Sequence, residues 1–580
     1  MPPITPNGLI TRKAMYVYDD FDQRIINERV TQFQDQMDRY IDGKIPEEEF
    51  LPLRLQNGIY IQRYAPMLRI AVPYGMLNSQ QLRVMAEIAR DYDRGYAHFS
   101  TRQNLQYNWP KLEECPEILG KLAQVQMHAV QTSGNCIRNT TTDEYAGVIA
   151  EELVDPRPYC EIIRQWSTFH PEFAYLPRKF KIAVNAVEGA DRAATRMHDV
   201  GVHIIRSAAG ELGYRVYAGG GLGRTPILSS VIREFLPEED LLTYLDAIVR
   251  VYNQFGRRDN KYKARIKILV KALGAERFSE LVEAEWAHIK DGNGKLPKEE
   301  LERIKSHFTE PDYLALEADP ASYTGALASD KAFARWVDRN VRTHKKPGYA
   351  VATFALKQKG TAPGDVTDSQ LFAVADLADK YSFGEARSTH QQNLVLADIE
   401  QAKLYDLWQE AKALGLATPT LGLLTDMICC PGGDFCALAN AKSLPIAEAI
   451  QNAFDDLDYL HDLGEIDLNI SGCMNACGHH HIGNIGILGV DKKGEEFYQV
   501  SIGGASGEDA SVGKILGPSF ARDRMTEIIR TLLDVFVAQR IEGEAFIETF
   551  RRVGMDPFKA AAYPDKVSPA KDKSAPAAAK

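Results

Sequence analysis

Apolar and polar positions follow two different periods along the first part of the chain. Residues 79–92, SQQLRVMAEIARDY, place apolar side chains every three to four positions, which predicts an amphipathic helix. The following residues 98–109, HFSTRQNLQYNW, form a strand-like segment. Long helical patterns return at residues 238–256 and 521–540, each after several strand-like segments. The chain therefore mixes helices and strands throughout, which indicates an α+β protein.

The pattern of residues 75–105 occurs a second time at residues 364–394. With a constant offset of 289 and no gaps, eleven of the 31 positions are identical. They include Gly75/Gly364, Gln81/Gln370, Leu82/Leu371, Tyr92/Tyr381, Gly95/Gly384 and Gln103-Asn104-Leu105 against Gln392-Asn393-Leu394. A looser pairing sets KFKIAVN, HDVGVHII and YRVYAGGGLG against DLNISGC, HHIGNIGIL and FYQVSIGGASG. We infer a duplicated α+β unit in the order A, B, A′, B′, in which the retained tripeptide has a structural role.

Composition and charge exclude several classes of protein. The 580 residues carry 68 Lys and Arg against 79 Asp and Glu, so the net charge of −11 argues against a general nucleic-acid-binding surface. The start of the chain has no secretory signal pattern, and no segment is apolar enough to span a membrane. We expect a cytoplasmic globular protein whose eight cysteines stay reduced and available for metal or redox chemistry.

The two copies carry different chemistry at paired positions. The first copy has cations at Arg102, Arg138, Lys179 and Lys181, where the alignment gives the second copy Gln391, the Cys429-Cys430 pair, Asp467 and Asn469. Lys179 and Lys181 fall on one face of a strand-like segment, because side chains alternate along a strand. The first copy has gathered cations and the second copy cysteines.

Five cysteines lie within 49 residues, spaced Cys430-x5-Cys436 and Cys473-x3-Cys477 with Cys429 beside the first. Four thiolates at mixed spacings suit an iron–sulfur cubane better than the paired C-x2-C spacing usual around zinc. A zinc site and a set of small buried side chains are the alternatives. Because adjacent thiols point in different directions, only one of Cys429 and Cys430 is expected to reach the metal.

Seven motifs together resemble the sulfite/nitrite reductase hemoproteins, which bind siroheme and a [4Fe-4S] cluster. They are LRLQNGIYIQR, STRQN, NCIRN, LPRKFK, GGGLGRTP, CCPGGDFC and GCMNACG, and the resemblance extends to about residue 560. It implies an internally duplicated α+β fold with two ferredoxin-like halves and two siroheme/iron–sulfur-type α+β domains related by pseudo-twofold symmetry. The expected boundaries are an N-terminal extension at 1–50, a first half at 51–124, a first repeat domain at 125–335, a second half at 336–415, a second repeat domain at 416–563 and a disordered tail at 564–580.

The resemblance also implies a site. Its cluster ligands are Cys430, Cys436, Cys473 and Cys477, and the last thiolate also bridges to the siroheme iron. Its substrate-facing cations, which polarise bonds to oxygen and donate protons, are Arg102, Arg138, Lys179 and Lys181. Arg63, Arg69, Arg178, Arg224 and Arg265 are candidates for binding siroheme carboxylates, and Gln103 for a polar contact. Each of these can equally be a residue that supports the fold.

The substrate and the electron donor are less directly encoded. Sulfite-reducing relatives tend to have Lys-x-Lys where nitrite-reducing ones often have Lys-x-Asn, and Lys179-Phe180-Lys181 favours sulfite, with nitrite as a second substrate. We expect assimilatory reduction of sulfite to sulfide; the alternatives are a ferredoxin-dependent nitrite reductase and a non-enzymatic iron–sulfur electron carrier. The chain has no flavin or nicotinamide fingerprint. Electrons must come from ferredoxin or an NADPH-dependent flavoprotein, and the basic run 256–271 can dock an acidic ferredoxin or face the siroheme.

The histidine run 479–481 and the pair Cys136 and Tyr60 each allow two interpretations. His479, His480 and His481 are expected to contact siroheme carboxylates or the residues that surround the metal ligands. Ordinary packing of these side chains is the alternative. Cys136 and Tyr60 lie in cofactor-facing segments and are either a thioether cross-link or two ordinary packed side chains.

Overall fold

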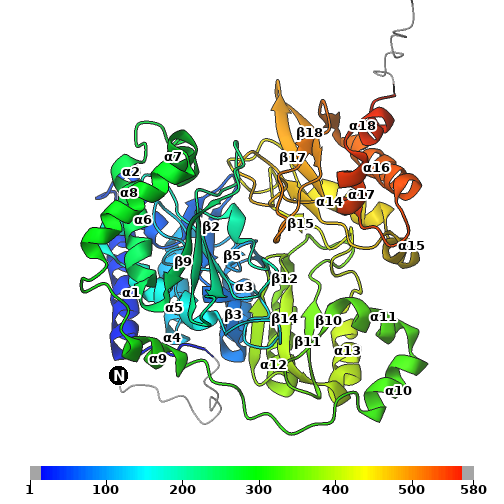
Figure 1. The fold of residues 1–580 in the computed structure, drawn as a ribbon, viewed down its shortest axis with the longest axis horizontal. Coiled ribbons are helices and arrows are strands. Elements are labelled where there is room, and N and C mark those ends of the chain that lie inside the picture. Colours follow the sequence, from blue (N-terminus) through cyan, green and yellow to red (C-terminus); the bar gives the residue numbers. More distant parts are fainter. Residues whose placement is uncertain (1–14, 565–580) are drawn as a thin grey trace, which may run out of the picture.

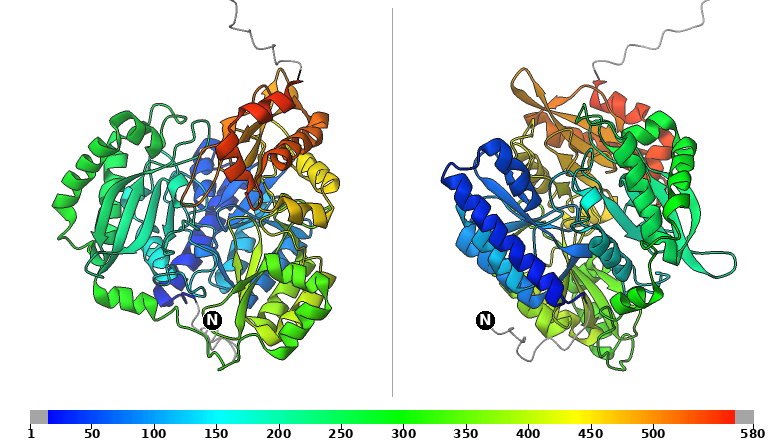
Figure 2. Two further views of the ribbon diagram at one scale, coloured as in Figure 1. Left: turned by 45° about the vertical axis from the view of Figure 1, so that its right-hand side comes forward. Right: turned by 90° about the vertical axis from the view of Figure 1, so that its left-hand side faces the viewer.

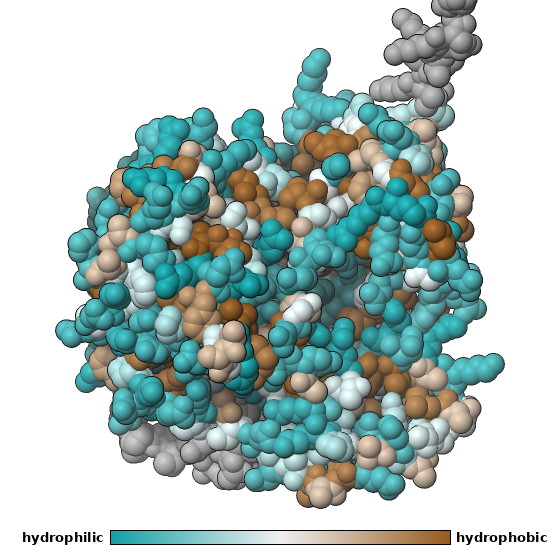
Figure 3. Space-filling view, in the orientation of Figure 1, coloured by the Kyte–Doolittle hydropathy of each residue, from teal (hydrophilic) through white to brown (hydrophobic). Residues whose placement is uncertain are grey.

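The computed structural model describes residues 15–564 of the chain. Residues 1–14 of the expected N-terminal extension and residues 565–580 of the expected tail lie outside the described part. Within residues 15–564, no helix is long and apolar enough to cross a membrane. The face shown in Figure 3 is mostly hydrophilic, with apolar side chains in small scattered groups and a hollow near its centre.

Two five-stranded antiparallel sheets form the middle of the molecule (Figure 1). The first runs in the order β1 (Ile59–Ile61), β2 (Pro66–Ile70), β5 (Leu105–Tyr107), β4 (Tyr96–Phe99), β12 (Asp365–Thr367). The second runs β10 (Val341–Thr343), β11 (Tyr349–Phe354), β14 (Leu394–Glu400), β13 (Glu385–Ser388), β3 (Met76–Asn78). Each half lends one edge strand to the other, since β12 pairs with β4 and β3 with β13. This exchange makes the two ferredoxin-like halves one pseudo-twofold unit.

The retained glutamines cap equivalent helices, α3 (Ser79–Tyr92) and α12 (Asp368–Tyr381). Each is the third residue of a capping box, with Asn78 capping α3 and Thr367 capping α12. The Gln81 amide also donates to Val125 O at 3.1 Å, and the Gln370 amide donates to Leu414 O at 2.9 Å. The identity of these residues in both copies therefore reflects the fold and not the chemistry of a site.

The expected continuous strand over residues 98–109 is wrong. The structure has β4 and β5 joined by a turn at residues 100–104, because Gln103 adopts a positive φ of 59°. Gln392 adopts φ 63° at the paired turn between β13 and β14. Asn104 and Asn393 accept the backbone N–H groups of Val72 and Leu356, respectively, at 3.1 and 3.0 Å. The structural role predicted for the tripeptide is confirmed.

Each repeat domain contains its own sheet, of four strands in the first and six in the second, and the order β6-β7-β8 of the first matches β16-β17-β18 of the second. The first sheet runs in the order β6 (Ile182–Asn185), β7 (Val200–Arg206), β8 (Leu212–Ala218), β9 (Ser230–Pro237). The second runs in the order β15 (Ile428–Cys429), β16 (Leu468–Ser471), β17 (Ile485–Lys492), β18 (Glu495–Ile502). At its edge, β19 (Lys514–Ile515) and β20 (Phe520–Ala521) both pair with β18. β6 pairs with β7, and β16 with β17, in parallel, and both next strands are antiparallel. The looser second repeat is thus confirmed.

The register of that second repeat differs from the sequence alignment by two residues. Val200 donates its N–H to Lys181 O at 3.1 Å, and Ile485 donates to Asp467 O at 3.0 Å. Lys181, and not Lys179, is therefore the counterpart of Asp467. The conclusion that the second copy has no cation there is unchanged.

The helices complete three main cores. The two ferredoxin-like halves share one hydrophobic core, whereas each repeat domain has a separate one. α6 (Leu241–Phe255) and α16 (Met525–Gln539) occupy the predicted long helical segments, and α1 (Asp20–Ile41) runs along the outside of the first half (Figure 2). The remaining helices are α2 (Glu47–Gln56), α4 (Cys115–Gln124), α5 (Arg157–Ser167), α7 (Ile266–Leu273), α8 (Ala275–Ile289), α9 (Lys298–Lys305), α10 (Ala321–Ser329), α11 (Lys331–Asn340), α13 (Leu404–Ala413), α14 (Leu444–Ala453), α15 (Leu457–Leu463), α17 (Phe546–Val553) and α18 (Asp556–Ala562).

Candidate functional site

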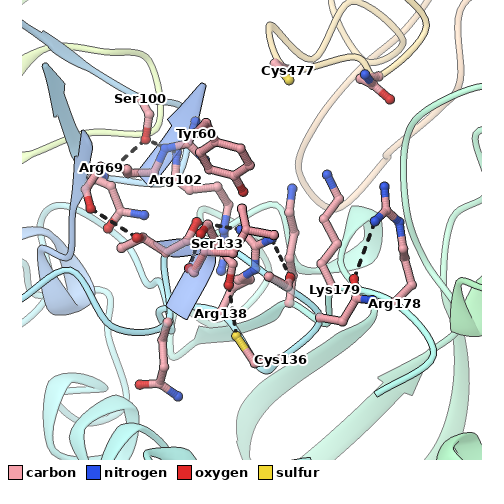
Figure 4. Close-up of a pocket in the computed structure, with 18 of the residues that line it drawn as sticks. Tyr60, Arg69, Ser100, Arg102, Ser133, Cys136, Arg138, Arg178, Lys179 and Cys477 are labelled. Carbon is pink, nitrogen blue, oxygen red and sulfur yellow. Dashed lines mark hydrogen bonds between the residues drawn. The ribbon is translucent and has the colours of Figure 1, made fainter. Parts of the chain in front are cut away.

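A cavity of about 940 Å³ lies where the first half meets the two repeat domains. Its lining combines first-copy cations with four second-copy cysteines, Cys430, Cys436, Cys473 and Cys477. Figure 4 shows Cys477 on a loop facing Lys179 and Arg138 across this space. The structure thus brings together the two groups of residues that the duplicated sequence kept on separate copies.

The charge of the cavity wall is opposite to that of the whole protein. Nine cationic side chains line it: Arg29, Arg69, Arg102, Arg138, Arg178, Lys179, Lys181, Arg258 and Arg265. Among the described residues that line the cavity there is no Asp or Glu, although the net charge of the chain is −11. Arg265 is paired with Asp199, but the other eight cations have no ion pair among the described residues. Such a concentration of positive charge is favourable when an anion occupies the cavity. The cavity is therefore suited to one or more polyanionic groups.

Lys179 and Lys181 lead into β6 and project into the cavity on either side of Phe180, which is fully buried. In the described part of the chain, neither amine has a hydrogen bond or an ion pair with a protein group. Burial lowers the pKa of Lys179 to about 7, although the Cys477 thiol opposes this shift. Burial and then the neighbouring Lys179 lower the pKa of Lys181 well below its usual value. Both amines are available to bind an anion and to release a proton.

The two arginines that the resemblance places at the substrate, Arg102 and Arg138, are bonded to backbone carbonyl groups. Arg102 donates to Thr141 Oγ1 at 2.7 Å, Asn139 O at 2.6 Å and Ile182 O at 3.3 Å. Arg138 donates to Thr132 O at 2.6 Å and to Gly134 O at 2.7 Å. Burial lowers the pKa of Arg102 to about 9. These contacts fix the positions of the guanidinium groups, so the arginines form a rigid cationic wall behind the two free lysines.

Arg265 holds the buried carboxylate of Asp199 in place. It forms a two-bond ion pair with Asp199, at 2.9 and 2.8 Å, and Asp199 also accepts the Lys181 N–H at 2.9 Å. Asp199 is fully buried. The pair thus fixes the backbone from which Lys181 projects.

The two cysteine-bearing loops cross where glycine allows their backbones to meet. A Cβ on Gly472 would lie 2.5 Å from Gly432 Cα, and one on Gly478 would collide with Ile470 O. The Gly472 N–H donates to Cys430 Sγ at 3.2 Å. Close crossing brings the Cys430 and Cys473 loops to the same side of the cavity, and a backbone N–H points at the Cys430 sulfur.

The four second-copy thiols of the cavity, those of Cys430, Cys436, Cys473 and Cys477, are free, and none forms a disulfide. Burial raises the pKa of Cys430 to about 12 and that of Cys473 to about 11, so a thiolate there needs a metal to stabilise it. Within residues 15–564, no three Cys, His, Asp or Glu side chains converge closely enough to hold a single metal ion. Thiols that surround a space without meeting at a point fit a group several ångströms across, such as an iron–sulfur cluster, better than one zinc ion.

Of the residues expected to bind siroheme, Arg69, Arg178 and Arg265 line the cavity, but Arg63, Gln103 and Arg224 do not. Arg224 is exposed, and Arg63 donates to Gly433 O. Gln103 is fully buried and donates to Ser388 O at 3.1 Å. A siroheme contact by these three residues has no support in this geometry.

The three consecutive histidines, His479, His480 and His481, have different surroundings. His479 lines the cavity, whereas His481 contacts Gly223 O at 2.9 Å through Nε2. His480 is buried against the His481 ring with a centroid distance of 3.9 Å. Packing therefore accounts for His480 and His481, and only His479 is placed to contact a group in the cavity.

Tyr60 and Cys136 both line the cavity, and their cross-link stays a prediction. The Cys136 thiol donates to Ser133 O at 3.2 Å (Figure 4). Burial opposes ionisation of Tyr60, but Arg138 and Arg69 outweigh it and lower the pKa of the phenol.

Among the lining residues that sequence reasoning did not assign to the site, three polar ones are Arg29, His98 and Gln392. Arg29 comes from α1, in the segment treated as an extension, and no motif marks it. His98 and Gln392 also line the cavity. The retained Gln103-Asn104-Leu105 tripeptide pointed to Gln392, but only as a structural residue.

Comparisons with known proteins agree with this site. The chain matches the description "Nitrite and sulphite reductase 4Fe-4S domain" at residues 133–290 and 423–568, and "Nitrite/Sulfite reductase ferredoxin-like half domain" at 62–125 and 345–414. It is 29% identical over 503 residues to "Sulfite reductase [ferredoxin] 2" of Mycolicibacterium paratuberculosis, covering 84% of this chain and 82% of that protein. It is 27% identical over 525 residues to the "Assimilatory ferredoxin-dependent nitrite reductase" of Haloferax mediterranei, covering 86% and 84%.

A solved structure gives the same result for the fold. The NirA protein of Mycobacterium tuberculosis superposes with a TM-score of 0.73 at 26% identity, covering 92% of this chain and 97% of that one. The duplicated α+β fold and its ferredoxin-like halves are thereby confirmed. The matched domains extend over most of the chain, in both copies. This protein belongs to the nitrite and sulphite reductase family of oxidoreductases, which carry siroheme and a [4Fe-4S] cluster.

Proposed function

We propose that this protein is a ferredoxin-dependent sulfite reductase that reduces sulfite to sulfide in sulfur assimilation. The observation that carries the proposal is the pair of unpartnered amines, Lys179 and Lys181, in a cavity whose described lining has no acidic residue. Sulfite is largely a dianion near neutral pH, so two adjacent cations suit it better than they suit the monoanion nitrite. An electron carrier without a substrate has no need of this cationic wall.

The residues present fit both cofactors. Cys430, Cys436, Cys473 and Cys477 are proposed to hold the [4Fe-4S] cluster, and Cys477 would also hold the siroheme. Arg69, Arg178 and Arg265 are proposed to bind siroheme carboxylates. When bound, the two cofactors would supply the electrons for reduction of the substrate. Since siroheme carries eight carboxylates, its binding also balances much of the positive charge of the wall.

The cations of the first copy have two tasks in this reaction. Arg102 and Arg138, whose guanidinium groups are fixed by backbone carbonyls, orient the oxyanion without needing to reorganise. Lys179 and Lys181, whose amines have no protein partner among the described residues, donate protons to oxygens that leave as water. Because burial has lowered the pKa of Lys179 to about 7, its ammonium group releases a proton readily near neutral pH.

Nitrite is a second candidate substrate. A nitrite reductase is among the relatives that match most of the chain. Nitrite reduction to ammonia also takes six electrons, and nitrite is a smaller oxyanion. We expect it to be reduced with a lower kcat/KM than sulfite.

Ferredoxin is proposed as the donor because the relatives with that donor in their names cover most of the chain. The glycine run 219–223 lies between the antiparallel strands β8 and β9, so it is not a strand-to-helix nucleotide site. In the basic run 256–271, Arg265 and Lys267 point inward, whereas Arg257, Arg258, Lys261 and Lys263 are exposed. Arg258 also lines the cavity, which supports docking of an acidic protein near its rim.

The proposal is tested with purified, cofactor-loaded protein. The absorption spectrum is expected to show siroheme bands above the broad iron–sulfur absorption, and reduced ferredoxin is expected to support sulfide formation from sulfite. An NADPH-dependent flavoprotein in place of ferredoxin is the matched arm for the donor. Sulfide formation with the flavoprotein and none with ferredoxin would refute the donor, and a spectrum without siroheme bands would refute the enzyme.

A further inference from the structure

Gln392 lies in the turn between β13 and β14 and contributes to the cavity wall, although it is only 1% exposed. Its side chain reaches the backbone of Cys429 from two directions. The Cys429 N–H donates to Gln392 Oε1 at 2.9 Å, and Gln392 Nε2 donates to Cys429 O at 3.1 Å. A single amide therefore holds both polar groups of Cys429, the residue that directly precedes Cys430.

The orientation of this amide is fixed by its surroundings. Nε2 also donates to Phe99 O at 2.9 Å and lies 3.0 Å from His98 Nε2. A rotation of the amide by 180° would place Oε1 against two carbonyl oxygens and leave the Cys429 N–H facing an NH₂ group. Because an NH₂ group does not accept, His98 Nε2 is an acceptor that shares the two hydrogens of this group with the two carbonyl oxygens, and His98 Nδ1 donates to Asp365 Oδ1 at 2.7 Å.

The clamped backbone separates the two adjacent thiols. Cys429 is fully buried, it is absent from the cavity lining, and its thiol donates to Cys430 O at 3.3 Å. Cys430 lines the cavity, and its sulfur accepts the Gly472 N–H at 3.2 Å. Because successive side chains of an extended segment point in opposite directions, fixing the Cys429 backbone also fixes which thiol faces the cavity.

The turn that carries Gln392 is itself anchored by a buried cation. Lys357, with a fully buried side chain, donates to Gln391 O at 2.7 Å, Gln392 O at 3.1 Å and Asn393 Oδ1 at 2.9 Å. Asn393 Nδ2 in turn donates to Asp426 Oδ1 at 2.9 Å, on the segment that leads to Cys429. The clamp is therefore rigid at both ends.

The first copy contains the same turn, which reaches the Cys477 loop through Thr101 Oγ1, a donor to Cys477 O at 2.9 Å, and not through its glutamine. Gln103 has a similar φ, donates to Ser388 O at 3.1 Å and accepts the Thr142 N–H at 3.4 Å. The shared geometry belongs to the fold, but only the second-copy glutamine contacts a cysteine. Gln103 thus supplies an internal control for Gln392.

We propose that Gln392 is a positioning residue for the iron–sulfur cluster: its amide clamps the Cys429 backbone so that Cys430, and not Cys429, presents its thiolate and keeps the Gly472 N–H bond to its sulfur. This inference rests on the proposed function, in which Cys430 is a cluster ligand. Hydrogen bonds to cluster sulfurs are among the determinants of reduction potential, and N–H donors favour the reduced, more negative cluster. Loosening the clamp should therefore make the potential more negative.

The test compares Gln392→Met with Gln103→Met in the cofactor-loaded enzyme. Both substitutions remove a buried amide that bonds to the backbone, so both should lower the thermal midpoint. Only Gln392→Met is expected to change the electron paramagnetic resonance spectrum of the reduced cluster and to shift its midpoint potential to more negative values. If Gln392→Met does not accumulate as folded protein, Gln392→Asn retains an amide but withdraws it by one methylene, and the same shift is expected.

Two results would overturn the inference. One is a wild-type cluster spectrum and potential in a folded Gln392 variant, and the other is an equal spectral change in Gln103→Met. Cys430→Ser separates this inference from the proposed function. If Cys430→Ser keeps a complete four-iron cluster with the wild-type spectrum, the ligand assignment itself is wrong; if it loses the cluster while Gln392→Met has no effect, only the positioning role fails.

Discussion

Replacing Lys181 by Asn removes one of the two free amines from the cavity. Because the Lys181 amine has no partner among the described residues, the substitution leaves no protein carboxylate unpaired. Burial holds its pKa well below the usual value, which means that the charged form is destabilised in the folded protein. Lys181→Asn should therefore leave the thermal midpoint unchanged or slightly higher while lowering activity.

The expected loss of activity follows from the strength of a charge-assisted hydrogen bond. Such a bond contributes about 1.5–3 kcal/mol, which corresponds to a roughly 10- to 150-fold decrease in kcat/KM for sulfite. Nitrite carries half the charge of the sulfite dianion, so its kcat/KM should fall less. Steady-state reduction with a chemical electron donor measures both values on one preparation. Equal losses for the two anions, or a large fall in the thermal midpoint, would contradict the role assigned to Lys181.

Other substitutions test the cluster loops and the cationic wall. Cys436→Ser should lower the iron content and the visible iron–sulfur absorption, whereas Cys429→Ala should retain both; iron loss in both variants would argue against the ligand assignment. Arg265→Met leaves the buried Asp199 carboxylate unpaired and should cost about 3–5 kcal/mol of stability, measured as a lower urea midpoint; an unchanged midpoint would show that the ion pair is not structural. Gly478→Ala should prevent cluster loading because its Cβ would meet the Ile470 carbonyl, so a normal iron content would contradict the packing described for that loop.

Internal duplication made much of the fold predictable from one sequence. Matched helices at residues 79–92 and 368–381, and the matched strand order of the two repeat domains, follow from periodicity and self-similarity. The exchange of β3 and β12 between the halves was not predictable, because a three-residue edge strand carries no signal about its partner. The interruption of residues 98–109 was missed because a positive φ at Gln103 is set by tertiary contacts of its amide.

The site was predictable to the extent that its chemistry differs between copies. Residue type alone separated the cysteines of one copy from the cations of the other, and the fold places both at one cavity. What residue type does not encode is which cations are already partnered. Arg102 and Arg138 bond to backbone carbonyls, whereas Lys179 does not, and that distinction depends on segments far away in the sequence. Arg29 was likewise unpredictable, since only packing brings its helix to the cavity.

The cationic wall of the first copy is proposed to bind sulfite and supply protons, while cofactors held by the second copy would supply the electrons. The most direct measurement is the ratio of kcat/KM for sulfite to that for nitrite, determined on one cofactor-loaded preparation with a chemical electron donor, so that the partner protein plays no part. The account predicts a ratio well above one, with sulfide as the product. A ratio below one, with ammonia formed from nitrite as the faster reaction, would contradict it.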